Sequence, residues 1–264
     1  MTDPIRLSHR TPKAGASSGT EASLDTPVLV LFDIDGTLLI RAHVEHRHAL
    51  ADAVREVYGV ADPGPAAVPA AGRTDGEIAR EICLLGGVSA ERIDAAQDDF
   101  RAACATAYAR RCPPDLRDRL APHVEDVLRA LENHDAVKLS LVTGNLEAVA
   151  RLKLARAGLG DYFPTGQGAF GSDAEDRTEL PAIARRRAGA NGTPYPRAGT
   201  VVVGDTPNDI ACAHADGVRC VAVATGPYAA AELDKADAVV TGLDDLERVL
   251  LSDPPARTPP RARP

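Results

Sequence analysis

The stretch VLVLFDIDGT, Val28–Thr37, decides the fold of this chain. It opens with a run of aliphatic and β-branched residues without a polar interruption, which is typical of a strand buried on both faces of a parallel sheet. The run ends at two carboxylates, Asp33 and Asp35, and Gly36 allows the chain to turn sharply out of the strand. The sequence therefore predicts a buried strand over Val28–Asp33 that leads into an acidic turn.

Three more runs of this kind follow, at Val137–Thr143, Thr200–Asp205 and Cys220–Thr225. Helical patterns lie between and after them, over Leu146–Ala157, Leu180–Ala188 and Pro207–Ala215. Alternating strands and helices form βαβ crossovers, so we expect an α/β fold with a doubly wound parallel sheet covered by helices on both faces. Ligands of such sheets bind at the carboxyl ends of the strands.

The region 41–120 has helical periodicity over Ala49–Tyr58, Glu77–Leu85 and Ala90–Ala109, and it has no strand pattern. We interpret it as a small helical cap domain inserted after the first strand, with a loop over Asp62–Gly72. The α/β catalytic core would then comprise residues 27–40 and 121–251. The remaining segments, 1–26 and 252–264, have biased compositions without periodicity and are expected to be disordered tails.

Composition excludes several classes of function. The chain has 264 residues, a net charge of −8 and a pI near 5.4, which disfavours a nucleic-acid partner because phosphate binding needs clustered Lys and Arg. No apolar run approaches membrane-spanning length, so no membrane partner is expected. Five cysteines without a C-x-x-C pair indicate buried small hydrophobic residues. The first residues lack the apolar segment of a secretory signal, so we expect a cytoplasmic protein.

A second acidic cluster, Gly204–Asp209 (GDTPND), also follows an apolar run. Thr206 suits a helix N-cap, and Asp209 either completes a capping box or is a metal ligand. Asp205 lies before the cap, at the predicted strand end. Carboxylates from two strand ends would repel each other unless a cation held them, and oxygen ligands of this kind suit Mg²⁺.

The second strand run ends in Thr143, Gly144 and Asn145, and a helical pattern follows. A hydroxyl and backbone N–H groups at a helix start form an anion site. The alternative is that Thr143 or Asn145 is only the N-cap of the helix.

In combination, the motifs at Asp33–Thr37, Val142–Asn145 and Gly204–Asp209 resemble the first, second and fourth motifs of the haloacid dehalogenase superfamily of hydrolases. The resemblance covers roughly residues 28–250, and the helical region resembles the small cap of that superfamily. The segments GRTD, Gly72–Asp75, and KLARAGLGDYF, Lys153–Phe163, are most similar to phosphoglycolate phosphatase-like members.

The resemblance implies a Mg²⁺-dependent phosphatase that hydrolyses a small phosphorylated metabolite, phosphoglycolate-like or a sugar phosphate, through an aspartyl-phosphate intermediate. It assigns Asp33 as nucleophile and Asp35 as general acid and base. The implied metal ligands are Asp33, the backbone carbonyl of Asp35, and Asp205, with Asp209 as a further candidate. Thr143, Gly144 and Asn145 would hold the phosphoryl oxygens.

The third motif of the family is a Lys or Arg, and this chain departs from the common Lys-Pro pattern. Arg177 lies just before a helix expected to open near Thr178, at the carboxyl edge of the sheet. Lys153 is the alternative, although it falls about two turns into the helix after the second strand. We favour Arg177, and for each residue a plain surface charge is the competing interpretation.

Other polar residues carry weaker signals. His43, His46 and His48 suggest a metal site, but a polar face of the first cap helix is the favoured interpretation. Arg73 could bind a second anionic group of the substrate, or it could simply belong to a loop whose helix is capped by Thr74 or Asp75.

Three other functions compete with the phosphatase. A phosphomutase would share all the motifs. A 2-haloacid dehalogenase of the superfamily does not use the second carboxylate of the first motif, so Asp35 argues against it. A non-catalytic binding protein would be expected to have lost Asp33, Asp35 or Asp205, and all three are present.

Overall fold

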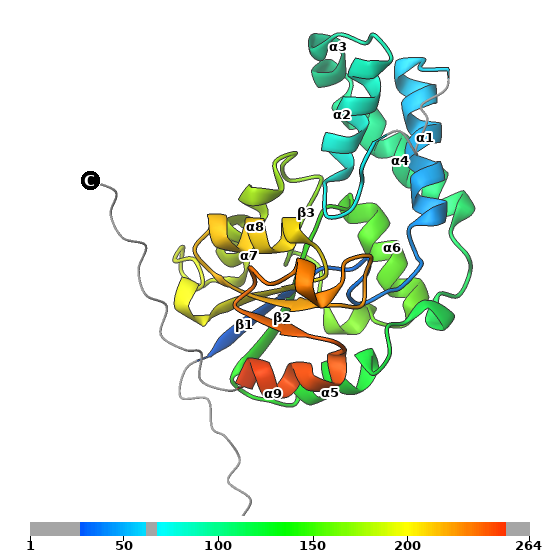
Figure 1. The fold of residues 1–264 in the computed structure, drawn as a ribbon. Helices are drawn as coiled ribbons and strands as arrows, with labels where there is room; N and C mark the ends of the chain where they lie inside the picture. The colour runs from blue at the N-terminus through cyan, green and yellow to red at the C-terminus, as the bar shows by residue number, and fades with distance from the viewer. Residues whose placement is uncertain (1–26, 62–67, 252–264) are drawn as a thin grey trace, which may run out of the picture.

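A parallel sheet of six strands forms the centre of the protein (Figure 1). The computed structural model describes residues 27–61 and 68–251. The strand order is β3-β2-β1-β4-β5-β6, and every neighbouring pair is parallel. The strands are β1 Val28–Phe32, β2 Val137–Thr143, β3 Ala169–Phe170, β4 Thr200–Gly204, β5 Arg219–Val223 and β6 Ala238–Val240. The doubly wound α/β fold predicted from the sequence is confirmed.

Strands β3 and β6 were not predicted, because two or three residues are too few to show a pattern. The last predicted run, Cys220–Thr225, forms β5 but ends two residues earlier, at Val223.

The two faces of the sheet carry separate hydrophobic clusters. Leu29 and Leu31 of β1 pack on one face, while Val30 and Phe32 pack on the other, as the two-residue period of a strand requires. The first face is covered by α7 Leu180–Ala188 and α8 Pro207–Ala215. The second is covered by α5 Val124–Glu132, α6 Glu147–Ala157 and α9 Leu246–Leu251.

The first four helices after β1 gather on one side of the core (Figure 1). They are α1 Val44–Tyr58, α2 Asp75–Leu85, α3 Ala90–Ala95 and α4 Gln97–Arg111. Helix α1 packs against both α4 and α2. The insertion of a helical cap after the first strand is confirmed, and the domain limits themselves stay a prediction. Within the predicted loop, residues 62–67 lie outside the described residues, as do the predicted tails.

The single helix predicted over Ala90–Ala109 is wrong, because the chain leaves the helical conformation at Ala96. The Tyr58 hydroxyl donates to the carbonyls of Ile93 and Ala96, at 3.3 and 3.4 Å. These two hydrogen bonds tie α1 to the point where α3 ends.

The five cysteines are unpaired and buried, as expected from their spacing. Over the described part of the chain, no helix has both the length and the apolar character needed to cross a bilayer.

A buried ion pair joins the two helices on the first face. Arg185 of α7 donates to both carboxylate oxygens of Asp216, which follows α8, at 2.6 and 2.9 Å. Both side chains are less than a tenth exposed. Removing one partner of such a pair leaves an uncompensated buried charge.

We expect Asp216→Asn to lower the free energy of unfolding by about 3–5 kcal/mol, the usual cost of breaking a buried pair. Urea unfolding monitored by circular dichroism measures it. The control is Asp126→Asn, whose partner Arg129 is exposed, and this change should cost about 1 kcal/mol or less. Equal losses in the two variants would show that the buried pair contributes no more than a surface pair.

Candidate active site

The strand order creates a crevice between β1 and β4. After β1 the chain crosses to β2 on one side, and it later returns to β4 on the other side, so the ends of these strands flank a topological switch point. Asp33 follows β1, Asp205 follows β4, and Thr143 ends β2. Residues far apart in the sequence therefore meet at one edge of the sheet.

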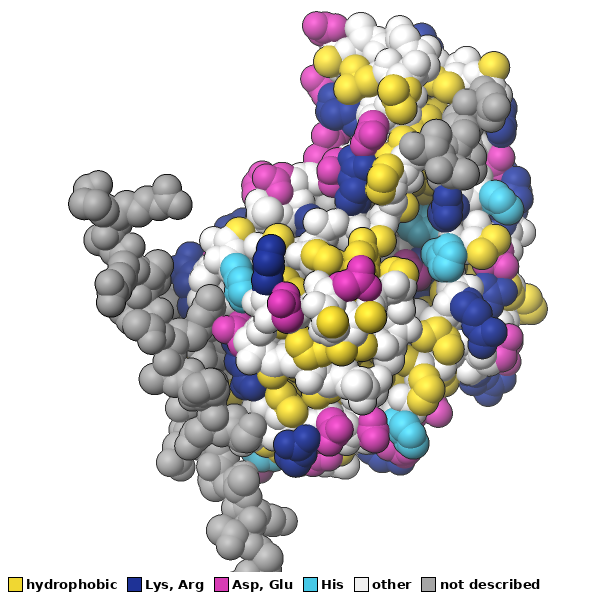
Figure 2. All heavy atoms as spheres, in the orientation of Figure 1, with side chains coloured by type: hydrophobic (Ala, Val, Ile, Leu, Met, Phe, Trp, Pro, Cys, Tyr) yellow, Lys and Arg dark blue, Asp and Glu magenta, His cyan; other side chains and the backbone are white. Residues whose placement is uncertain are grey.

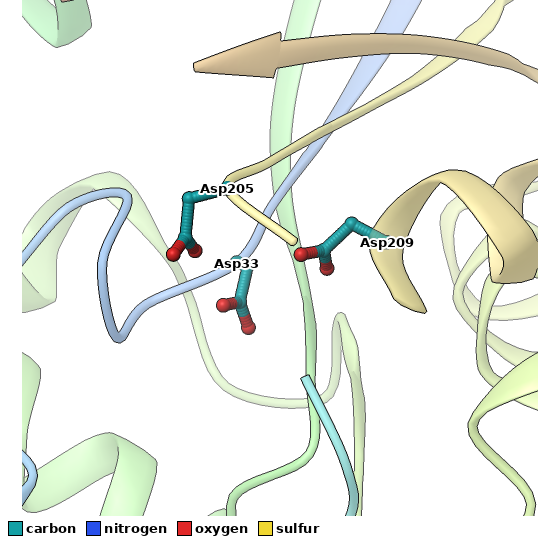
Figure 3. Close-up of side chains that lie close together, drawn as sticks. All are labelled: Asp33, Asp205 and Asp209. Carbon is teal, nitrogen blue, oxygen red and sulfur yellow. The ribbon is translucent and has the colours of Figure 1, made fainter. Parts of the chain in front are cut away.

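Three buried carboxylates cluster at this edge (Figure 3). Asp33, Asp205 and Asp209 each offer an oxygen atom within 4.8 Å of the other two. Burial raises the pKa of Asp33 to about 7 and that of Asp205 to about 9, and the neighbouring carboxylates add to both shifts. Without a cation, the protein holds this cluster partly protonated near neutral pH.

The acidic turn after β1 depends on a glycine. Gly36 has a φ of 93°, in the region that favours glycine. A Cβ atom there would also lie 2.2 Å from Oδ2 of Asp205. The turn therefore lets Asp205 sit directly against it, and the Thr37 hydroxyl donates to Asp205 Oδ1 at 3.2 Å.

Two carboxylate oxygens at the site are buried without a hydrogen-bond partner among the described residues, namely Asp35 Oδ1 and Asp205 Oδ2. An unpaired buried acceptor is costly, and a cation removes that cost. The donors are all oxygens, which is the ligand set that Mg²⁺ prefers. The residues present therefore fit Mg²⁺, and the ligands that we predict are Asp33, the backbone carbonyl of Asp35, and Asp205.

Asp209 has a structural role that the sequence also suggested. Its Oδ2 accepts from the backbone N–H and the hydroxyl of Thr206, at 3.0 and 2.7 Å, and the Thr206 hydroxyl accepts from the Asp209 N–H. The capping box is thus confirmed. Its Oδ1 contacts Arg177, so protein donors already engage both oxygens, and a role as metal ligand stays a prediction.

Arg177 lies where the sequence analysis placed the cation. It opens the short 3₁₀ helix η3, Arg177–Glu179, and its guanidinium bridges Asp33 and Asp209. The distance from Arg177 Nη2 to Asp33 Oδ1 is 3.2 Å. The side chain is buried, so the interpretation of Arg177 as a surface charge is wrong.

Lys153 is also a buried cation of the site, and the interpretation as a surface charge is wrong here too. Its ammonium group donates to Asp35 Oδ2 at 2.5 Å and to Asn145 Oδ1 at 2.7 Å. The side chain is fully buried and reaches back along α6, because helical side chains point toward the N-terminus. Lys153 therefore reaches Asp35 although it lies about two turns into α6.

The two cations have different effects on the pKa values of the two carboxyl groups. Burial favours the neutral form of Asp35, but the charge of Lys153 and the hydrogen bonds to it hold the pKa of Asp35 below its usual value. Asp33 keeps a raised pKa because its contact with Arg177 only partly offsets burial. The geometry thus gives one carboxylate that stays ionised and one that ionises readily only beside an added cation.

Two side chains of the cap, His46 and Asp75, reach the core beside Lys153 and Leu146. His46 Nε2 lies 3.0 Å from Asp75 Oδ2, and the same oxygen accepts from the Leu146 N–H at 2.7 Å. His46 Nδ1 lies 3.2 Å from the Lys153 ammonium, so a cap histidine contacts the cation that holds Asp35. These contacts join α1 and α2 to the start of α6.

The histidines form no metal site among the described residues. His43 and His48 are exposed, as expected for a polar helix face, but His46 is buried. His46 shares its stripe of α1 with Ala49 and Leu50, which are also buried. That helical spacing is the signal that could have shown that His46 faces inward.

The loop after β2 is held by Asn145. Its Nδ2 donates to Asp35 Oδ2 at 3.0 Å and to the Thr143 hydroxyl at 2.9 Å. The N-cap of α6 is Leu146, so the interpretation of Thr143 or Asn145 as the N-cap is wrong. Gly144 and Asn145 line a cavity between the cap and the core, and their role toward phosphate stays a prediction.

Arg73 lines the same cavity, but its guanidinium is already paired. It contacts Glu77 at 2.8 Å and Glu81 at 2.7 Å, and it donates to the Pro69 carbonyl at 3.0 Å. The predicted N-cap at Thr74 is confirmed, because the Thr74 hydroxyl accepts from the Glu77 N–H. Binding of a substrate anion by Arg73 stays a prediction.

Sequence reasoning missed Thr37 and did not connect Asp75 with His46. Thr37 belongs to the acidic turn, and its place directly after Gly36 is the available signal. His46 and Asp75 are 29 residues apart and belong to two different helices, so no local sequence pattern indicates their contact.

A family model for haloacid dehalogenase-like hydrolases matches residues 30–214, most of the chain. The chain belongs to the haloacid dehalogenase-like hydrolases. The family assigned by resemblance is thereby confirmed. No curated protein matches the sequence.

Solved structures share this fold at low sequence identity. A predicted phosphatase from Clostridium acetobutylicum is 16% identical with a TM-score of 0.60, over 86% of this chain and 99% of that one. A predicted phosphoglycolate phosphatase from Haemophilus somnus is 19% identical with a TM-score of 0.58, over 88% and 99%. A β-phosphoglucomutase from Clostridium difficile is 16% identical with a TM-score of 0.57, over 84% and 93%. At these identities the likeness shows the fold alone.

The raised pKa values predict a pH-dependent effect of Mg²⁺. Between the usual pKa of Asp, 3.8, and the raised values of Asp33 and Asp205, the folded protein binds more protons than the unfolded chain. The metal-free protein therefore loses stability as the pH rises through this window. Mg²⁺ binds the ionised carboxylates, so its addition should raise Tm more near pH 8 than near pH 6, by mass action on the folded state.

Differential scanning fluorimetry with and without Mg²⁺ measures this difference. Asp205→Asn should remove most of the increment, whereas Asp126→Asn, on the exposed face of α5, should keep it. An increment that is equal at the two pH values would contradict the proposed ligands.

Proposed function

We propose that this member of the family is a Mg²⁺-dependent phosphatase that hydrolyses a phosphate monoester through an aspartyl-phosphate intermediate. The observation that carries the proposal is the pairing of two neighbouring carboxylates with two different buried cations, Asp33 with Arg177 and Asp35 with Lys153. A cavity of about 730 Å³ opens onto both carboxylates and holds room for the ester.

Asp33 is the proposed nucleophile. An oxygen of Asp33 would attack phosphorus while the bond from phosphorus to the ester oxygen breaks. Bound Mg²⁺ would supply positive charge to neutralise the phosphoryl oxygens. Arg177, which contacts Asp33 directly, would hold the phosphoryl group in line and add a second positive charge.

Asp35 is the proposed proton carrier. A phosphate dianion beside it would raise its pKa, so that Asp35 takes up a proton and gives it to the leaving ester oxygen. After the alcohol leaves, Lys153 and Asn145 favour ionised Asp35, which then takes a proton from the water that attacks the aspartyl phosphate. The contacts from Lys153 and Asn145 also fix the carboxylate in one orientation.

This arrangement favours a phosphatase over the dehalogenase and the non-catalytic alternatives. Neither of these needs a second carboxylate, yet Asp35 is oriented by two donors, and Lys153 is fully buried to supply one of them. Burying a lysine is costly unless it is paired, so this pair indicates a use for Asp35. A phosphomutase would use the same residues, and its product would be an isomeric phosphate ester instead of free phosphate.

The division of roles between Asp33 and Asp35 predicts different losses. Asp33→Asn should abolish phosphate release. Asp35→Asn should slow alkyl phosphates by roughly 10²–10⁴, the range for a general acid or base, and should slow p-nitrophenyl phosphate less because that leaving group hardly needs a proton. Steady-state kcat/KM for both esters measures this, with Asp126→Asn as a control of matched chemistry.

Equal losses on both esters in Asp35→Asn would contradict its role toward the leaving group. Activity that persists in excess EDTA would contradict the metal requirement. Accumulation of an isomeric ester without free phosphate would establish the phosphomutase.

The two cations predict a second contrast. Arg177→Met should reduce kcat/KM by about 10²–10³, and by the same factor for alkyl and p-nitrophenyl esters, because both carry the same phosphoryl charge. Lys153→Met should affect alkyl esters more than p-nitrophenyl phosphate, because it acts through Asp35. Thermal melts confirm that each variant is folded. The reverse pattern would make Lys153 the cation that neutralises the phosphoryl group.

A further inference from the structure

The cavity that meets the two catalytic carboxylates has two chemically different walls. The core side carries the polar groups of the site, among them Asp33, Asp35 and Arg177. The cap side carries charged and histidine side chains, and in addition a group of aliphatic side chains, namely Leu50, Val68, Ile78 and Ile82. Figure 2 shows hydrophobic side chains reaching the hollow between the cap helices and the core, with basic and histidine side chains at its edge.

The cavity is larger than a phosphate ester of a two-carbon alcohol. Its volume of about 730 Å³ lies within the range of roughly 300–1,000 Å³ that is occupied by drug-sized ligands. A phosphoryl group with a two-carbon alcohol would fill only part of this volume, so the aliphatic side chains of the cap would gain few contacts from it.

Several charges on the cap side are compensated within the protein. Arg73 pairs with Glu77 and Glu81, so a carboxylate of the substrate would have to compete with two protein carboxylates. His46 and Asp75 pair with each other. Arg41, His43 and Arg47 also line the cavity; Arg41 and His43 are exposed and Arg47 is half-buried, in contrast to the buried aliphatic side chains.

We infer that the enzyme acts on phosphate monoesters of a bulky, apolar alcohol, with the alcohol packed against Leu50, Ile78 and Ile82 of the cap. The inference rests on the proposed phosphatase function and narrows its substrate. It departs from the phosphoglycolate-like substrate that the sequence suggested, because Arg73, the residue that the sequence offered for a second anionic group, is already paired with Glu77 and Glu81.

Binding of non-hydrolysable phosphonates tests the inference without turnover. Calorimetry in the presence of Mg²⁺ would compare methyl-, propyl- and hexylphosphonate with phosphonoacetate, which carries a carboxylate. Affinity should rise by up to about fourfold per methylene group, the effect of burying one CH₂. Phosphonoacetate should bind more weakly than propylphosphonate.

Ile78→Thr keeps a β-branched side chain but makes that part of the wall polar, so it should reduce the gain from methyl- to hexylphosphonate. The control is Leu84→Thr on the same helix, because Leu84 is half-exposed and lies outside the cavity. Thermal melts establish that both variants fold. An equal reduction in both variants would overturn the assignment of this wall to the alcohol.

A second pair of variants tests whether Glu77 and Glu81 keep Arg73 from binding a carboxylate of the substrate. The double change Glu77→Gln and Glu81→Gln removes both carboxylates from Arg73 at partly exposed positions. It should strengthen phosphonoacetate binding by about tenfold, the effect of one charged hydrogen bond, and change hexylphosphonate little. The control is Glu56→Gln with Glu91→Gln, which removes two cap carboxylates that do not contact Arg73.

The outcomes separate the inference from the function on which it rests. If phosphonate affinity rises with alkyl chain length but p-nitrophenyl phosphate is not hydrolysed, the apolar site is supported and the phosphatase function is overturned. Hydrolysis of that ester with affinity that is flat along the alkyl series, or highest for phosphonoacetate, would overturn the apolar substrate alone. The absence of binding by every phosphonate would also overturn it.

Discussion

Mutual repulsion among buried carboxylates is the constraint on which the rest of this structure depends. The acidic residues after β1 and β4 lie at one sheet edge and are almost entirely shielded from water. Charges in such a place interact strongly and lose their hydration. Arg177, Lys153 and the Thr37 hydroxyl offset this repulsion. Asp205 Oδ2 has no hydrogen-bond partner among the residues that the structure describes, which leaves room for a metal ion.

The two buried cations are held by different parts of the fold, and this separates their effects. Arg177 lies at the start of η3, just before α7, and its guanidinium joins Asp33 to the capping box of α8. Lys153 lies within α6 and contacts Asp35, Asn145 and the cap residue His46. The second carboxylate is thus linked to the cap, whereas the first is linked only to the core.

The cap contributes polar contacts and apolar surface from the same two helices. His46 on α1 and Asp75 at the start of α2 reach the core at Lys153 and Leu146. A Cβ atom on Gly144 would lie 2.1 Å from the Arg73 carbonyl, so the cap loop and the end of β2 are in direct contact. This close seam encloses the cavity, and it places the aliphatic wall opposite the carboxylates.

The sequence by itself determined the α/β fold and the acidic residues at the strand ends, and it offered the capping box as one of two roles for Asp209. These features are local: apolar runs mark buried strands, and parallel strands bring their carboxyl ends to one edge. Only the tertiary structure decided which cation meets which carboxylate, that Lys153 is buried, and that Arg73 is compensated by Glu77 and Glu81. Lys153 and Asp35 are 118 residues apart, and the reach of a long side chain across packed helices depends on their geometry, which no local sequence pattern encodes.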